Sequence, residues 1–257
     1  MSRPLPPALP PDAPAVRLDA VTKRFGSHRV LDALTLDVPV GIGVWILGRS
    51  GTGKSVLLRH IIGLLQPDEG HVFVGGEDVT RLSSAELARV RPKIGFLFQN
   101  AALFDSLTVG ENVALPLRRH TDLGEAEIRD RVLRTLDSVG LKRDVDKMPA
   151  ALSGGMRKRA GLARAMALEP PILLADEPSA GLDPITSDEI DRLLLGLKRD
   201  RGTTLLVVTH NVPSARVLGD ELVFLHEGRV LDRGTATALE ASEHEMVRTF
   251  LRSEGSG

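Results

Sequence analysis

The chain has 257 residues, 42% of them hydrophobic and 26% charged, a composition typical of one α/β domain of ordinary size or of a core with an inserted subdomain. Its 33 Lys and Arg residues nearly balance 34 Asp and Glu residues, which argues against a global electrostatic attraction to nucleic acid and leaves only a local patch open. The chain has no cysteine, so disulfides and thiolate chemistry are excluded, which fits a cytoplasmic protein.

The N-terminal segment 1–14 and the short apolar runs set the expected relation to membranes. Proline is too frequent in this segment for the apolar region of a signal peptide, so we expect a solvated, disordered, polyproline-like tail. No apolar run approaches the ~18–20 residues that are needed to cross a bilayer. We therefore expect a soluble chain that reaches a membrane only through a partner protein.

Apolar runs predict the strands of the first part of the chain. Alternating apolar residues predict strands at 16–18 and 30–38, and compact runs predict further strands at 44–47, 71–74 and 94–98. The last of these runs shows little alternation, which indicates a strand that is covered on both faces.

The character of the sequence changes between residues 100 and 164. Apolar residues recur at helical spacing in segment 123–139, and segments 112–117 and 154–168 also suit helices. None of this stretch resembles a buried strand. We expect a helical arm that interrupts the sheet.

Strand signals return at 172–175, 204–208 and 221–225, with a helix after the first of them that Asp183 can cap and Pro184 can begin. Residues 253–257 look frayed. The expected parts are the tail 1–14, a core of 15–99 and 165–240, a helical subdomain 100–164, and a C-terminal helix and tail 241–257.

A glycine-rich loop follows a predicted strand and precedes a predicted helix. Residues 48–55 fit the phosphate-binding pattern GxxxxGK[ST], with Gly48, Gly53, Lys54 and Ser55 at its fixed positions. Glycines let the backbone turn its N–H groups inward, Lys54 can reach the terminal phosphates of a nucleotide, and the Ser55 hydroxyl can ligate Mg²⁺. The sequence therefore predicts a nucleoside triphosphate site.

Two acidic residues, Asp176 and Glu177, follow the apolar run 172–175. Buried strands seldom end in charge without a partner, and ligands bind at the carboxyl edge of an open α/β sheet. Asp176 suits Mg²⁺, directly or through water, and Glu177 suits the attacking water, as a general base or as a positioning group. Alone, the pair could be two solvated acids in a turn. Its place after an apolar strand and downstream of a phosphate loop favours a site.

Four further features have ordinary interpretations when each is taken alone. Segment 152–156, Leu-Ser-Gly-Gly-Met, could be a simple helix start capped by Ser153, or a place where two glycines let a ligand approach the helix N–H groups. Gln99 could be a surface glutamine, His210 a structural histidine and Phe25 a core aromatic residue.

The order of these motifs resembles the ATP-binding subunit of ABC transporters over roughly residues 16–240. The phosphate loop, a glutamine at a strand end, Leu-Ser-Gly-Gly-Met, the acidic strand end, Ser-Ala-Gly-Leu-Asp at 179–183 and a histidine at a strand tip follow one another in that order. The resemblance implies an α/β fold with a RecA-like P-loop NTPase core and a mostly parallel sheet, an N-terminal antiparallel β subdomain and an inserted α-helical subdomain. It also implies ATP and Mg²⁺ as cofactors.

The resemblance implies a role for each matching residue. Glu177 would be the catalytic carboxylate, His210 would contact the γ-phosphate and hold the attacking water, and Gln99 would sense Mg²⁺ and that water. Phe25 would stack on adenine. The implied catalytic set is Glu177, His210, Lys54 and Gln99, and the implied metal set is Ser55, Gln99 and Asp176. The implied ATP-binding set is Phe25, Gly48, Arg49, Ser50, Gly51, Thr52, Gly53, Lys54, Ser55 and Val56, together with Ser153, Gly154, Gly155 and Met156 toward the ATP of a second copy.

Residues 153–156 would thus serve a neighbouring chain, and two copies packed head to tail would form two complete sites.

Within the family, segments 48–65, 98–118 and 152–165 look most like the ATPase of Mla-type (MCE-associated) phospholipid transport systems. This likeness implies integral membrane permease subunits, an MCE-domain substrate-binding protein and a small regulatory subunit as partners. It implies a place at the cytoplasmic face of the inner membrane, peripheral through the permease.

Other functions stay open at this point. An amino acid, a metal chelate or a lipoprotein could be the cargo, because such an ATPase does not touch what it moves. A non-transport ATPase acting on ribosomes or DNA is disfavoured, since the chain has one phosphate loop and no heptad run, and we expect no nucleic acid partner.

Segment 100–118 could hold a short helix of a membrane subunit or pack internally. The basic run 157–159 is interpreted as a solvated helix face, with contact to lipid or a partner as the alternative.

Overall fold

The computed structural model describes residues 5–253, apart from the side chain of Ser253, and its larger sheet has the order β10-β9-β3-β8-β7-β6. The expectations for residues 1–4 and 254–257 lie outside the described residues. This sheet is parallel except for β10, which pairs antiparallel with β9. Its strands are β3 (Gly43–Leu47), β6 (Ile94–Leu97), β7 (Ile172–Asp176), β8 (Thr204–Val208), β9 (Glu221–His226) and β10 (Arg229–Gly234).

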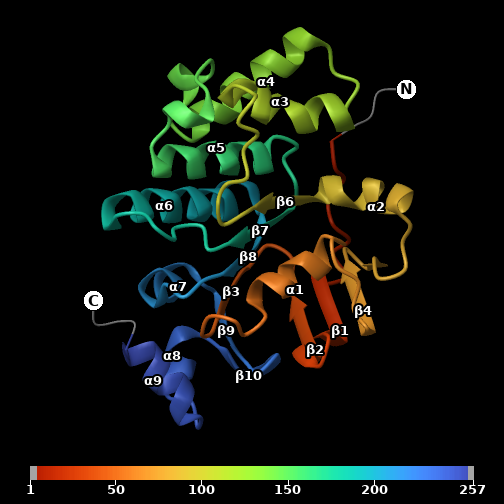
Figure 1. The fold of residues 1–257 in the computed structure, drawn as a ribbon, viewed down its shortest axis with the longest axis vertical. Helices are drawn as coiled ribbons and strands as arrows, with labels where there is room; N and C mark the ends of the chain where they lie inside the picture. Colours follow the sequence, from red (N-terminus) through yellow and green to blue (C-terminus); the bar gives the residue numbers. More distant parts are fainter. Residues whose placement is uncertain (1–4, 254–257) are drawn as a thin grey trace.

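A smaller, fully antiparallel sheet lies beside the larger one, in the order β2-β1-β4-β5. It is built from the N-terminal part of the chain (Figure 1). Its strands are β1 (Val16–Phe25), β2 (His28–Val38), β4 (Glu69–Val74) and β5 (Glu77–Asp78). The predicted combination of a mostly parallel core and an antiparallel β subdomain is confirmed.

Helices form three groups around these sheets (Figure 1). The helices α1 (Lys54–Ile61), α2 (Ser84–Val90), α6 (Pro184–Arg201) and α7 (Val212–Leu218) accompany the two sheets. The helical arm lies at the top of Figure 1 and consists of α3 (Val109–His120), α4 (Glu125–Ser138) and α5 (Gly154–Met166). At the opposite end lie α8 (Ala236–Glu240) and α9 (Glu245–Ser253), and single 3-10 turns occur at Arg91–Lys93, Lys142–Asp144 and Pro149–Ala151.

Side-chain caps explain where the functional helices begin. Ser153 caps α5, because its hydroxyl accepts a hydrogen bond from the N–H of Met156 over 3.2 Å. Asp183 caps α6 by accepting from the N–H groups of Ile185 and Thr186, and Pro184 occupies the first turn, as the sequence predicts. These caps fix the helix ends that face the sheet edge.

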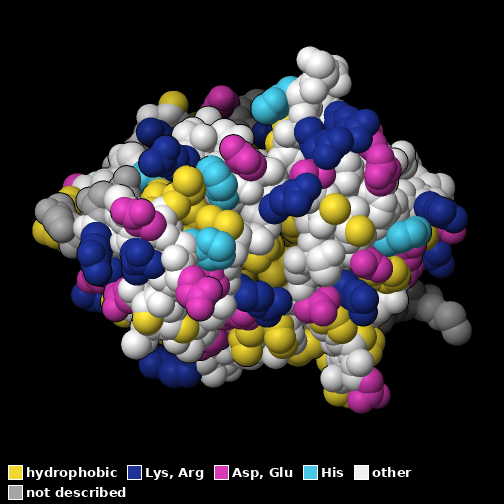
Figure 2. All heavy atoms as spheres, turned by 90° about the horizontal axis from the view of Figure 1, so that it is seen from below, with side chains coloured by type: hydrophobic (Ala, Val, Ile, Leu, Met, Phe, Trp, Pro, Cys, Tyr) yellow, Lys and Arg dark blue, Asp and Glu magenta, His cyan; other side chains and the backbone are white. Residues whose placement is uncertain are grey.

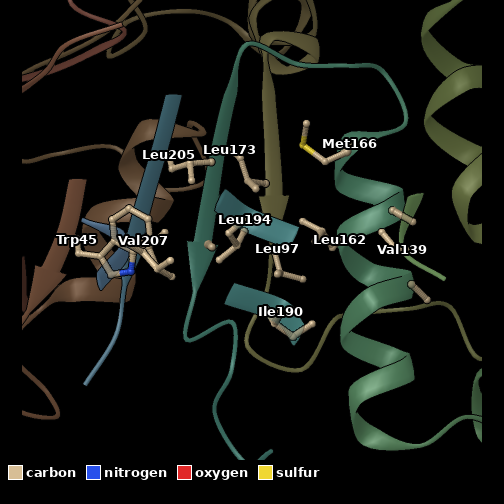
Figure 3. Packing of buried hydrophobic residues seen from close by; sticks show 14 of the residues in the cluster. Trp45, Leu97, Val139, Leu162, Met166, Leu173, Ile190, Leu194, Leu205 and Val207 are labelled. Atoms are coloured by element: carbon tan, nitrogen blue, oxygen red, sulfur yellow. The ribbon is translucent and has the colours of Figure 1, made fainter. Parts of the chain in front are cut away.

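The five parallel strands of the larger sheet are covered on both faces, and neighbouring residues of these strands point into different cores. On β3, Trp45 and Leu47 enter a core shared with α5 and α6, whereas Val44 and Ile46 enter one shared with α1 and the smaller sheet. Figure 3 shows the first core, in which Leu173, Leu205 and Val207 of the sheet face Leu162, Ile190 and Leu194 of the helices. The carboxyl ends of β3, β6, β7 and β8 therefore have a rigid support.

The structure differs from the sequence expectation in the N-terminal segment. The side chain of Leu9 is only 9% exposed and packs in the core of the antiparallel subdomain, near Gly75. Residues 5–10 have no regular secondary structure, but an apolar side chain among the prolines is enough to hold the segment against the domain. The expectation of a solvated tail is therefore wrong for Leu9.

Opposite charges are mixed on one face of the molecule. Figure 2 shows Lys and Arg side chains interspersed with Asp and Glu on the face seen from below. Within residues 5–253, the helices are all too short or too polar to span a bilayer.

Candidate nucleotide-binding site

The phosphate loop joins β3 to α1 at the carboxyl edge of the sheet. A side chain at Gly53 would place its Cβ 2.9 Å from the carbonyl oxygen of Val30, and one at Gly48 would collide with the carbonyl of Leu225, so both positions require glycine. Both residues also have positive φ, at 97° and 153°. The sequence pattern thus corresponds to a loop pressed between β2 of the smaller sheet and the end of β9 of the larger one.

Lys54 lies across this loop with its charge nearly buried. Its Nζ donates to the carbonyl oxygens of Gly48, at 2.6 Å, and Arg49, at 2.9 Å, and the residue is 8% exposed. Burial lowers the pKa of the Lys54 ammonium, while Glu177 and Asp176 act in the opposite direction. The ammonium is therefore already positioned where a phosphate chain would follow the loop.

Ser55 and Asp176 meet although they are far apart in the sequence. The Ser55 hydroxyl donates to Oδ1 of Asp176 over 2.9 Å, and Asp176 ends β7 with an exposure of only 6%. Burial raises the pKa of the Asp176 carboxyl, and the hydrogen bond from Ser55 opposes that shift. A hydroxyl and a carboxylate held together in this way are hard oxygen donors of the kind that Mg²⁺ prefers, so the pair fits the predicted metal.

Glu177 sits at a strained bend directly after β7. Its φ is +48°, which is uncommon for a residue with a side chain, and its N–H donates to the carbonyl of Val208 over 2.9 Å. Three groups converge on Oε2 of its carboxylate: the Thr209 hydroxyl at 3.1 Å, the His210 N–H at 3.4 Å and Nδ1 of His210 at 3.0 Å. The bend thus turns this carboxylate away from the sheet and toward the tip of β8.

A cavity of about 780 Å³ gathers most of the predicted site residues. Phe25 stands at its edge, 49% exposed, with Nζ of Lys23 at 5.7 Å from the ring centroid, so the alternative of a core position for Phe25 is wrong. Asp176 and Thr52 are not on its wall; Asp176 lies beneath Ser55, and the Thr52 hydroxyl donates to the carbonyl of Arg49. The predicted residues on the wall are Phe25, Gly48, Arg49, Ser50, Gly51, Gly53, Lys54, Ser55, Val56, Gln99, Glu177 and His210.

Three wall residues were missed by the sequence analysis. His28 and Val30 belong to β2, just after the hairpin turn that carries Phe25, so their nearness follows once that hairpin is recognised. Phe250 comes from α9 and packs edge-on against Phe224 of β9, with the ring centroids 5.1 Å apart. No short-range pattern links Phe250 to the loop, because only tertiary packing brings α9 there.

The predicted residues 153–156 lie elsewhere. None of them lines the cavity, and Ser153 and Gly154 are exposed at the start of α5. Gly155 is buried against Thr186 of α6, where any side chain would collide. The structure therefore separates the predicted residues into two places: a cavity at the sheet edge and the start of α5.

The basic run 157–159 is not one solvated face. Consecutive helical residues point about 100° apart, and only Arg157 is exposed. Lys158 is 5% exposed, and its Nζ donates to the carbonyl oxygen of Glu177 over 2.8 Å. Arg159 donates to the carbonyl of Val139 at the end of α4. The interpretation fails for Lys158 because its face of α5 packs on the sheet edge.

A parallel sheet in which one strand, β3, leads into a phosphate loop and another, β7, ends in an acidic residue that reaches this loop is the arrangement of P-loop nucleoside triphosphatases. Residues 31–180 match the family described as ABC transporter. The chain belongs to this family, as an ATP-binding subunit that hydrolyses ATP to energise transport.

Relatives in this family carry different cargo names. The chain is 44% identical to the probable ribonucleotide transport ATP-binding protein mkl of Mycobacterium leprae over 243 residues, covering 95% of this chain and 70% of the relative. It is 41% identical to the methionine import protein MetN of Rhodopseudomonas palustris over 250 residues, covering 94% and 67%. It is 40% identical to the intermembrane phospholipid transport protein MlaF of Escherichia coli over 232 residues, covering 90% and 86%.

A solved structure has the same fold. It is the dimeric post-hydrolysis state of the ATP-binding cassette MJ0796 bound to ADP and Pi, which matches with a TM-score of 0.80 and 37% identity over 86% of this chain and 98% of that one. The likeness to a cassette with bound ADP agrees with a nucleotide site at the sheet edge.

Proposed function

We propose that the chain is the ATPase of a phospholipid transport system of the bacterial envelope and works as a head-to-tail dimer. One observation carries the dimer: the cavity wall holds Lys54 and Glu177 but none of residues 153–156. Of those residues, Ser153 and Gly154 are exposed at the start of α5, where helix N–H groups could bind a γ-phosphate held by another copy. The dimeric state of the similar cassette with ADP and Pi supports this arrangement.

The cargo assignment rests on the sequence segments that resemble Mla-type ATPases and on a relative, 40% identical, whose name gives phospholipid as the cargo. The ribonucleotide and methionine relatives are 44% and 41% identical, so identity alone does not separate the three cargoes. Ribonucleotide and methionine are the alternative cargoes.

The residues on the cavity wall can divide the work of hydrolysis. Lys54 would exchange its bonds to the loop carbonyls for phosphate oxygens when ATP enters. Oε2 of Glu177 is fixed by Thr209 and His210, so the carboxylate can orient the attacking water and accept its proton. The positively charged end of α1 and the loop N–H groups would hold the charge that develops on the phosphate.

Mg²⁺ would be held by the Ser55 hydroxyl and the Asp176 carboxylate, with Gln99 on the cavity wall beside the same space. When bound, the ion would neutralise charge on the β- and γ-phosphates. Burial of Asp176 disfavours the ionised form of its carboxyl group and so raises its pKa. A bound cation would stabilise the ionised form, so Asp176 is suited to bind one.

The proposed permease contact lies in a groove between the core and the helical arm. A cavity of about 470 Å³ there is lined by Phe98, Phe104 and Leu115, with Arg119 and Arg164 at its margin, and Phe104 is 52% exposed. Of its lining residues, Phe98 lies just before Gln99 in the chain and Phe104 shortly after it, which connects the groove with the nucleotide site. A short apolar helix of an integral membrane subunit fits this surface and would hold the chain at the cytoplasmic face of the inner membrane.

Glu177→Gln tests the catalytic and dimer assignments together. We expect retained Mg·ATP binding, hydrolysis slower by roughly 10²- to 10⁴-fold, and accumulation of a dimer that light scattering detects after size exclusion. Lys54→Ala is the contrasting variant and should weaken ATP binding itself. Wild-type phosphate release by Glu177→Gln would refute the general-base assignment, and a strictly monomeric Glu177→Gln protein in Mg·ATP would refute the dimer.

Purification from native membranes tests the cargo. The expected companions are a multi-span permease, an MCE-domain protein and a small regulatory subunit, with ATPase activity of the complex stimulated by phospholipid. Recovery of an amino-acid permease, or stimulation by methionine or a ribonucleotide and not by phospholipid vesicles, would overturn the phospholipid assignment and leave the ATPase assignment intact.

A further inference from the structure

The buried lysine of α5 reaches the backbone of the proposed catalytic residue. Lys158 is 5% exposed, and its Nζ lies 2.8 Å from the carbonyl oxygen of Glu177. A lysine buries its ammonium only where hydrogen bonds and opposite charge compensate for the lost hydration. Here the compensation comes from the Glu177 carbonyl and from the nearby carboxylates of Asp176 and Glu177.

The backbone bond matters because the conformation of Glu177 is strained. Its φ of +48° is not one that a glutamate adopts freely, so its surroundings must hold it. The N–H of Glu177 is held by the carbonyl of Val208 in β8. The carbonyl of Glu177 accepts from Nζ of Lys158 in α5, at 2.8 Å, and also from the N–H of Ala180 in the turn that follows, at 3.2 Å. The two peptide groups that flank the Cα of Glu177 are thus fixed by two separate elements, and the carboxylate direction follows from both.

The same helix begins with residues 153–156, which the proposed function assigns to the ATP of the partner chain. Lys158 lies in the next part of α5, so a short rigid segment separates the two contacts. A displacement of α5 when its first turn binds a phosphate would therefore change the hold on Glu177 in the same chain. Helices move as stiff units, so no further element is needed for this connection.

We propose that Lys158 is a positioning residue that keeps Glu177 in its strained conformation on the cavity wall. Lys158 would thereby link the start of α5, which serves the partner's ATP, to hydrolysis in the chain's own cavity. This inference rests on the proposed roles of Glu177 and of residues 153–156. It concerns the transition state and not ground-state ATP binding, because Lys158 is not on the cavity wall.

Lys158→Met tests the inference, since methionine keeps the length and apolar stem of lysine and removes the donor. We expect kcat to fall at least about tenfold while KM for ATP changes less than about twofold, because misplacement of a reacting group affects the transition state alone. Lys158→Arg restores a charged donor of similar reach and should recover part of the lost kcat. Lys158→Gln, which is too short to span the same distance, should behave as Lys158→Met and replaces it if that variant does not fold.

Arg159→Met is the matched control. Arg159 lies on the same helix and also donates to a backbone carbonyl, but that carbonyl belongs to Val139, away from Glu177. We expect a lower melting temperature with kcat within about twofold of wild type. A wild-type kcat in Lys158→Met, or equal losses of kcat in Lys158→Met and Arg159→Met, would overturn the inference.

Failure of this inference can be told apart from failure of the proposed function. If Glu177→Gln abolishes hydrolysis while Lys158→Met does not slow it, only the role of Lys158 is wrong. If Glu177→Gln hydrolyses ATP at the wild-type rate, the assignment of the base is wrong, and with it the reason for holding Glu177 in place.

Discussion

The two halves of the proposed dimer site, the cavity and the start of α5, are built in opposite ways. The cavity half lies at the end of a sheet buried on both faces, and its charged groups already have partners within the chain, as Lys54 has in the loop carbonyls and Asp176 has in Ser55. The other half is the first turn of α5, where Ser153 and Gly154 are exposed. One half is organised before any ligand arrives, and the other presents helix N–H groups to the solvent.

This difference has an energetic reason. Buried charges need fixed partners, so Lys54, Asp176 and Lys158 can be held only where strand ends and helices converge. A helix start that must accept and release a phosphate on every cycle cannot be buried in its own chain. On this comparison, the cavity would carry the groups that hydrolyse ATP, and the start of α5 would make a reversible contact with the second copy.

Mixing two inactive variants gives the largest expected effect. Lys54→Ala disables the cavity half, and Gly154→Asp places a negative charge at the start of α5 with only an ordinary contact to Leu182 in its way. Each variant alone should lose at least about 10²-fold in ATPase rate. An equal mixture should regain up to about a quarter of the wild-type rate, because half of the dimers are mixed and each mixed dimer has one intact site. Phosphate release before and after mixing measures the gain.

Gly154→Ala is the control for the second variant and should stay active, since it adds a methyl group without charge. A mixture that stays inactive would mean that each chain hydrolyses ATP with its own two halves. The mixed dimer also shows in which chain Lys158→Met acts. Added to the Gly154→Asp chain, whose Glu177 serves the intact site, it should lower the regained activity at least about tenfold. Added to the Lys54→Ala chain, it should leave that activity in place.

The sequence was sufficient for the cavity half because its signals are local. The loop with Lys54 and the strand end with Asp176 are short segments in which fold and chemistry coincide, and the parallel sheet brings them together at its edge. Lys158 and Phe250 could not be predicted in this way. Each acts through a contact between distant segments. The neighbouring residues in the sequence do not show that Lys158 is buried or that Phe250 lines the cavity, because the same local pattern would occur on an ordinary helix face.

Short elements were also beyond the sequence patterns. The helices α2 and α7 have seven residues each, too few to display an apolar period, and the 3-10 turns have three. The strand predicted at 16–18 continues to Phe25 because its later residues pair with β2 despite their charge. Leu9 was assigned to a solvated tail because the prediction used the average, proline-rich composition of residues 1–14. The contact of this segment with the domain is made by one apolar side chain, that of Leu9, which an average composition does not reveal.

Asp176→Asn should separate stability from function in the cavity half. Burial raises the pKa of Asp176, so the folded chain binds this proton more tightly than the unfolded chain does, and ionised Asp176 costs stability. The cost is absent at low pH and grows as pH rises through the raised pKa. Asparagine keeps an acceptor for Ser55 without the charge. We expect a melting temperature above wild type at pH 8, a smaller difference near pH 4, and Mg²⁺-dependent hydrolysis lower by at least about 10²-fold.

Thermal unfolding without nucleotide, followed from pH 4 to pH 8, measures the first effect. A melting temperature of Asp176→Asn below wild type across this range would show that the carboxylate stabilises the free chain and is not held ready for a cation. The stability gain together with the loss of activity is the pattern expected of a group whose partner is absent from the resting site.

Phe25 is the exposed member of the cavity half, and its truncation should have a moderate effect. Aromatic stacking on a base is worth roughly 1–3 kcal/mol by alanine substitution, so Phe25→Ala should weaken ATP binding by roughly 5- to 150-fold. Phe25→Tyr keeps the ring and should bind as wild type does. Calorimetric titration with a non-hydrolysable ATP analogue measures both. Equal affinities of Phe25→Ala and wild type would place the base elsewhere along the wall.

Two helix caps provide the smallest and most discriminating test. Ser153 caps α5 and Thr108 caps α3 in the same way, each hydroxyl accepting an N–H three residues on, at 3.2 and 3.1 Å. Alanine at either position should cost about 1 kcal/mol, or roughly 2–4 °C in melting temperature. Only Ser153→Ala should also slow ATP hydrolysis, because only its hydroxyl stands at the proposed contact with the partner's phosphate. If both variants lose stability and keep full activity, Ser153 is a cap alone, and the contact between copies depends on the backbone N–H groups that follow it.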